Sequence, residues 1–140
     1  MNILALAIGV VVSGLVIRGF NSRRLEDSRW GYPAFLATFP VYYWVFALLG
    51  SDLGALPTEI LAGLVFIVIA QVAARRRSTA TLALLAVGYL GHAAYDVVHD
   101  QLVSNAGVPA WSPEFCGAVD LLLGAYVALL ALRSRRMQSP

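Results

Sequence analysis

Five long apolar segments, separated by short polar ones, restrict the folds open to this chain. They cover residues 1–17, 33–50, 57–74, 79–99 and 115–132. A helix needs about 20 predominantly apolar residues to cross the hydrocarbon core of a bilayer, and about 17 is the lower end of the usual range. The segments therefore predict an all-α, polytopic membrane bundle of five transmembrane helices.

The composition agrees with a membrane protein. The chain is 59% hydrophobic and only 13% charged, whereas roughly a quarter of the residues in soluble domains are charged. Its 140 residues predict a single membrane domain, 1–140. The net charge of +2 gives no reason to expect a nucleic-acid partner. Cys116 is the only cysteine, so an intrachain disulfide is excluded.

The basic residues predict the orientation of the helices. All ten are arginines, and they fall in segments 18–29, 75–78 and 133–140. Cytoplasmic loops carry an excess of basic residues, so we expect the N-terminus outside and the C-terminus in the cytoplasm of a multi-pass inner-membrane protein. A cleaved signal peptide is the rival interpretation of segment 1–17, but that requires a positive charge before the apolar run. Here the arginines follow the run.

The fourth apolar segment ends in a concentration of ionisable residues. His92, Asp96, His99 and Asp100 fall within nine residues. On a helix His92, Asp96 and His99 share one face, because they lie at i, i+4 and i+7. Ionisable side chains inside a membrane are costly and usually functional. This segment is therefore the leading candidate for a functional site.

The fifth segment offers a partner for that face. Cys116, Asp120 and Gly124 are spaced by four residues and share one side of the helix. Small residues around an acid let a neighbouring helix approach closely. With the two helices antiparallel, Asp120 and His92 reach similar depths in the outer half of the membrane. We expect the Asp120 carboxylate within about 5 Å of His92 or Asp96, where direct charge and hydrogen-bond effects operate.

These residues form a pattern in the last third of the chain. It reads His92-x3-Asp96-x2-His99, then a loop with Pro109 and Trp111, then Pro113-x2-Cys116-x3-Asp120. The pattern resembles a family of small bacterial integral membrane proteins of unknown function. Family members often carry a histidine directly after the second histidine of the motif, where this chain has Asp100. The resemblance implies a shared site and no particular activity.

A divalent metal such as zinc is one hypothesis for the site. Histidine and aspartate are suitable ligands, and His92, Asp96, His99 and Asp120 supply four. His92 and His99 are separated by about 10.5 Å of helix rise. Two ligands from this helix together with Asp120 therefore make the easier geometry.

Metal-free acid–base catalysis is the second hypothesis. An apolar environment moves the pKa of carboxyl groups and imidazoles toward neutrality, where a general acid or base works best. Asp96 and Asp120 then act as acid and base, and His92 and His99 tune them. Isomerisation, cyclisation or hydrolysis of a lipophilic small molecule would fit. Expected walls of such a pocket are Tyr42, Tyr43, Trp44, Tyr89, Tyr95 and Trp111.

Several alternatives stay open at this point. A proton- or ion-coupled transporter needs polar groups across the whole membrane, and the inner half offers little beyond Gln71. A non-enzymatic binding or accessory module could use the same groove. Asp120 and His92 could also be hydrogen-bonded links between helices. We interpret Glu59 as an acid at a helix start and Cys116 as a small packing residue; association into a homodimer is left open.

Overall fold

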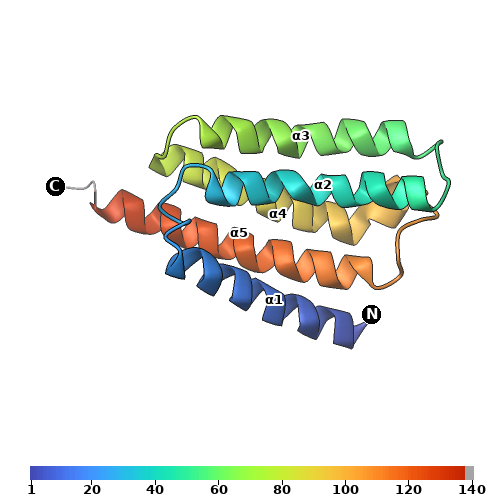
Figure 1. Ribbon diagram of the computed structural model, residues 1–140, viewed down its shortest axis with the longest axis horizontal. Coiled ribbons are helices and arrows are strands. Elements are labelled where there is room, and N and C mark those ends of the chain that lie inside the picture. The colour runs from blue at the N-terminus through green and yellow to red at the C-terminus, as the bar shows by residue number, and fades with distance from the viewer. Residues whose placement is uncertain (138–140) are drawn as a thin grey trace.

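A computed structural model describes residues 1–137, which form five α-helices and no strands (Figure 1). All five helices are long and apolar enough to cross a membrane, which confirms the predicted all-α, multi-pass class. They are α1 (Ile3–Ser22), α2 (Gly31–Leu49), α3 (Leu56–Ala74), α4 (Thr79–Leu102) and α5 (Ser112–Met137).

All five helices are longer than the apolar segments that predicted them, and α1, α4 and α5 exceed those segments by three residues or more. The first segment was expected to end at residue 17, but α1 continues to Ser22 and includes Arg18. The α4 helix runs past His99 to Leu102, and α5 runs from Ser112 to Met137, beyond both ends of its apolar segment. The length of an apolar segment matches the thickness of the hydrocarbon core. A helix can continue into the polar interface as long as its backbone hydrogen bonds continue.

Local signals explain where several helices start. The Asn2 side chain accepts a hydrogen bond from the Ala5 amide at 3.0 Å and caps α1. Ser78 and Thr81 form a reciprocal capping box at the start of α4. Pro57 lies in the first turn of α3, as expected from its fixed backbone angle. Local sequence therefore accounts for the starts of α1, α3 and α4.

The five helices form an elongated bundle (Figure 1). The α5 helix packs against α4 and α1, while α3 packs against α2 and α4. The connections 50–55 and 103–111 lie at the same end as the N-terminus, which we call the N-terminal end. The ten arginines occur toward the opposite end, which we call the arginine end.

A buried core fills the bundle from the arginine end toward its middle. Leu36, Tyr89, Leu123 and Val127 have no exposed surface. The Tyr89 hydroxyl donates to the Tyr32 carbonyl oxygen at 2.7 Å, which ties α4 to α2. Buried tyrosines usually satisfy their hydroxyl in this way. The polar residues of the predicted site lie beyond this core, toward the N-terminal end.

Candidate functional site

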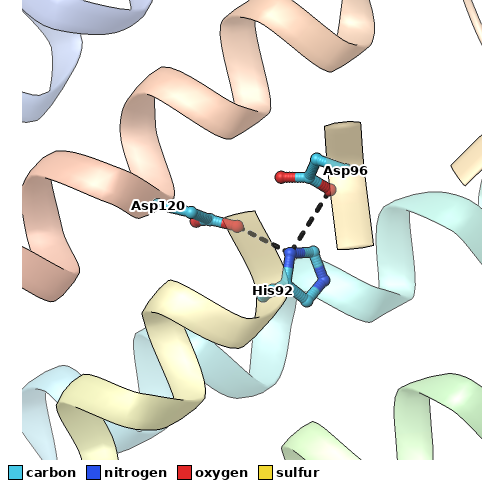
Figure 2. A group of neighbouring side chains, drawn as sticks. All are labelled: His92, Asp96 and Asp120. Atoms are coloured by element: carbon cyan, nitrogen blue, oxygen red, sulfur yellow. Dashed lines mark hydrogen bonds and ion pairs between the residues drawn. The ribbon is translucent and has the colours of Figure 1, made fainter. Parts of the chain in front are cut away.

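His92 lies between two carboxylates that come from different helices (Figure 2). Its Nδ1 atom is 2.6 Å from Asp120 Oδ2 on α5 and 3.4 Å from Asp96 Oδ1 on α4. All three residues are at most 2% exposed. The predicted approach of Asp120 to His92 within about 5 Å is confirmed.

The close packing of α4 and α5 brings these groups together. A Cβ atom added to Gly124 would lie 2.9 Å from Leu90 Cγ, closer than carbon atoms pack. One turn toward the N-terminal end, Asp120 points from the same face of α5 toward His92. The spacing of small residues around Asp120 therefore predicted the helix interface correctly.

Tyr43 of α2 adds a third helix to the site. Its hydroxyl donates to Asp96 Oδ1 at 2.8 Å, and the group is buried. Its ring stacks on the His99 imidazole with centroids 4.2 Å apart. The sequence suggested Tyr43 only as a pocket wall, because no spacing rule relates a residue on α2 to one on α4. The structure shows it as a direct partner of Asp96.

Two polar atoms of the site have no protein partner within the described residues. They are His92 Nε2 and Asp96 Oδ2, and both are buried. Buried polar atoms are rarely left unpaired without a functional or chemical reason. The nearby charges also do not balance, because two carboxylates surround one imidazole and the arginines lie toward the other end of the bundle. A proton or another cation is needed to compensate them.

The same three residues form a set of potential metal ligands. One ligand atom from each of His92, Asp96 and Asp120 lies within 4.8 Å of the others. Such a mixture of imidazole nitrogen and carboxylate oxygen suits zinc and similar divalent ions. His99, expected as a fourth ligand, is not part of this group. Its position one turn beyond Asp96 directs it to a different partner.

That partner is Glu59, the centre of a second buried cluster. Glu59 Oε1 lies 2.7 Å from His99 Nε2 and accepts from Asn105 Nδ2 at 2.8 Å. Glu59 Oε2 accepts from the Tyr95 hydroxyl at 2.9 Å. We call Glu59, Tyr95, His99 and Asn105 the Glu59 cluster. It ties α3, α4 and the 103–111 connection together at the N-terminal end.

The Glu59 cluster changes the interpretation of Glu59. An acid in the first turn of a helix is explained by the helix dipole alone, and the sequence favoured that explanation. In the structure Glu59 is 1% exposed and has three side-chain partners. No sequence pattern linked Glu59 to His99, because the two residues lie 40 positions apart on different helices.

The other candidate residues have more peripheral positions. The Asp100 side chain is 79% exposed and lies 3.4 Å from His99 Nδ1. Cys116 Sγ is 3.5 Å from the Ser112 hydroxyl oxygen, and its side chain lines a cavity next to the site. Cys116 therefore has a place near the site beyond helix packing.

That cavity has a volume of about 200 Å³ and is bordered by α1, α2, α4 and α5. Its polar wall contains Tyr43, His92, Cys116 and Asp120. Of the expected aromatic walls, Tyr42, Tyr43 and Trp111 line it.

Three other expected walls have different contacts. The Tyr89 hydroxyl donates a hydrogen bond to the backbone of α2, and the Tyr95 hydroxyl donates one to the Glu59 carboxylate. Trp44 Nε1 donates to the Glu59 carbonyl oxygen. These three side chains therefore link neighbouring helices. Periodicity along one helix does not reveal which neighbouring helix a ring will face.

Comparison with known proteins adds no relative. No protein-family model matches the chain, and neither a curated protein nor a solved structure matches it. The resemblance of the His/Asp pattern to a family of small bacterial membrane proteins therefore stays a prediction, and function has to be inferred from the site.

Proposed function

We propose that the protein is a membrane enzyme that uses acid–base chemistry on a lipophilic substrate. The observation that carries the proposal is the 2.6 Å contact between His92 Nδ1 and Asp120 Oδ2, on the wall of an apolar cavity. A positioned acid or base contributes roughly 10²- to 10⁴-fold to a reaction rate. A hydrogen-bonded imidazole–carboxylate pair in a water-poor cavity is suited to that role.

The residues have different roles in this proposal. His92 and Asp120 line the cavity and exchange the proton with the substrate. Asp96 is held by the Tyr43 hydroxyl and balances the charge on His92. His99 positions Tyr43 through ring stacking and takes no proton from the substrate. Isomerisation, cyclisation and hydrolysis all require such a proton transfer.

A metal-assisted hydrolase is the second candidate, favoured by the ligand atoms of His92, Asp96 and Asp120 lying within 4.8 Å. A bound divalent ion would supply a Lewis acid and an activated water. Elemental analysis of protein purified without chelator separates the candidates. About one equivalent of a transition metal in the wild type, lost in His92→Ala, would support the metal-assisted enzyme.

The first experiment compares lipids before and after incubation with the purified protein in nanodiscs. Lipids extracted from the source membrane serve as substrate, and mass spectrometry detects any species that is consumed. We expect the wild type to convert one species and Asp120→Asn to lower the rate at least about 100-fold. Asp100→Asn is the matched control, because that side chain is 79% exposed.

Folding of each variant is checked by circular dichroism and size-exclusion chromatography. Equal turnover by wild type and folded Asp120→Asn would contradict the acid–base proposal. Binding of a lipid species without conversion by the wild type would instead favour the non-enzymatic binding module.

A further inference from the structure

Resting on the proposed function, we infer that the cavity binds the planar, unsaturated portion of a membrane lipid, which enters sideways from the bilayer. A polyene chain and the ring of a prenylated quinone share this chemistry. Three features of the cavity favour such an occupant: the composition of its wall, its exposed margin and its size.

The cavity wall is unusually aromatic. Seven of the fifteen aromatic residues in the chain line it, whereas its only branched aliphatic side chains are Val12 and Val119. A saturated chain requires no such wall, and the exposed surface of α1 is built from residues such as Leu4, Val11 and Leu15. Aromatic rings favour stacked or edge-to-face contacts with other π-systems. The wall therefore selects for an unsaturated occupant.

The margin of the cavity includes side chains that are exposed on the surface of the bundle. Two lining residues, Tyr42 of α2 and Trp111 before α5, are 53% and 43% exposed. The Phe20 ring joins α1 to Tyr32 and Phe35 of α2 near the arginine end. Toward the N-terminal end α1 moves away from α2 (Figure 1). A substrate can therefore reach the cavity from the surrounding lipid without crossing water.

The size of the cavity indicates that only part of the substrate is enclosed. Its volume of about 200 Å³ is below the roughly 300–1,000 Å³ of pockets that hold a whole small-molecule ligand. The enclosed portion lies beside His92 and Asp120, and the remaining chain stays in the bilayer. The reacting group is therefore near one end of a long molecule.

In a polyene chain, this placement allows the His92–Asp120 pair to shift the position of a double bond. The pair donates a proton to one carbon of a C=C bond, whose π-electrons form the new C–H bond. The neighbouring carbon becomes cationic, and the faces of aromatic rings stabilise such a cation. Loss of a proton from the next carbon to the same pair forms a shifted double bond. The net reaction is an isomerisation that consumes no co-reactant.

Fluorescence of Trp111 can measure binding without turnover. Full-length protein in nanodiscs of saturated lipid is titrated with three probes: geranylgeraniol, its fully hydrogenated counterpart phytanol, and duroquinone. The signal of the Trp111→Phe variant is subtracted to remove the contributions of Trp30 and Trp44. We expect geranylgeraniol or duroquinone to bind saturably and at least tenfold more tightly than phytanol. The tighter of these two identifies the source as a polyene chain or a quinone ring.

Matched variants on α1 locate the binding. Val12 lines the cavity, so Val12→Phe should fill it and weaken binding at least tenfold. Val11, which is 61% exposed, is the control, and Val11→Phe should bind as the wild type does. Should Val12→Phe fail to fold, Tyr42→Ala at the opening replaces it, with weaker binding expected.

Equal affinity for phytanol, or unchanged affinity in Val12→Phe, would overturn the inference. Asp120→Asn separates this result from the proposed function, because it should keep the binding and lose the turnover. Selective binding without turnover by the wild type would therefore overturn the enzyme and leave the binding class standing.

Discussion

Individual polar side chains in the interior of this bundle are matched to one another across helices. Tyr43 is the clearest case, because its hydroxyl is the donor that compensates Asp96 Oδ1 from a different helix. A buried acceptor that loses its donor costs about 1–3 kcal/mol. Such a contact holds the Asp96 carboxylate beside His92.

We therefore expect Tyr43→Phe to lower the free energy of unfolding by about 1–3 kcal/mol. Reversible unfolding in mixed micelles by SDS, followed by circular dichroism, measures the change. Tyr42→Phe is the matched control, since that neighbouring side chain is 53% exposed and should change stability by less than about 0.5 kcal/mol. Equal stability of Tyr43→Phe and wild type would show that the hydrogen bond is not formed.

At the scale of helices, the site depends on how closely α5 approaches its two neighbours. Gly9 of α1 is buried against α5, and a Cβ atom there would lie 2.7 Å from the Phe115 carbonyl oxygen. Gly9, Ser13 and Gly14 form a patch of small residues along α1. The structure buries the first two and leaves Gly14 with no atom within 4 Å of an added Cβ. Only part of the patch therefore packs.

Substitution of the two glycines tests this difference. Gly9→Ala should destabilise the protein by about 1–3 kcal/mol, because the backbone of α5 has no room to adjust. Gly14→Ala should leave the free energy of unfolding unchanged or raise it by up to about 1 kcal/mol, since alanine is the better helix former. Thermal unfolding of both variants in the same detergent provides the comparison. A larger loss in Gly14→Ala would contradict the packing of α1 on α5.

At the scale of the whole molecule, charge is divided between the two ends. The arginines lie toward one end, whereas Asp52, Glu59 and Glu114 lie toward the other. This division supports the proposal of a cytoplasmic C-terminus and an outer-leaflet site. In that orientation the cavity opens to the outer half of the bilayer.

Cysteine labelling in intact cells tests the orientation. In a Cys116→Ala background, Leu53→Cys places a thiol in the 50–55 connection, where Leu53 is 66% exposed. Asn21→Cys places one near the arginine end. We expect a membrane-impermeant maleimide to label Leu53→Cys in intact cells, and Asn21→Cys only after the membrane is opened. The reverse pattern would place the N-terminus in the cytoplasm.

Sequence patterns alone specified the fold class of the molecule and the centre of its candidate site. Five apolar segments specify five helices, because each must satisfy its backbone within lipid. Helical spacing puts His92 and Asp96 on one face, and small residues around Asp120 specify the helix that meets it. Both relations follow from short-range periodicity along one chain segment.

The partners that α4 receives from α2 and α3 become apparent only when the helices are packed together. Tyr43 and Glu59 lie far from α4 in the sequence, and no periodic pattern relates them to Asp96 or His99. The residues predicted to form one site therefore belong to two groups in the structure, the His92–Asp96–Asp120 group and the Glu59 cluster. The rotation of each helix about its axis is fixed by packing against its neighbours, and that packing is a property of the assembled bundle.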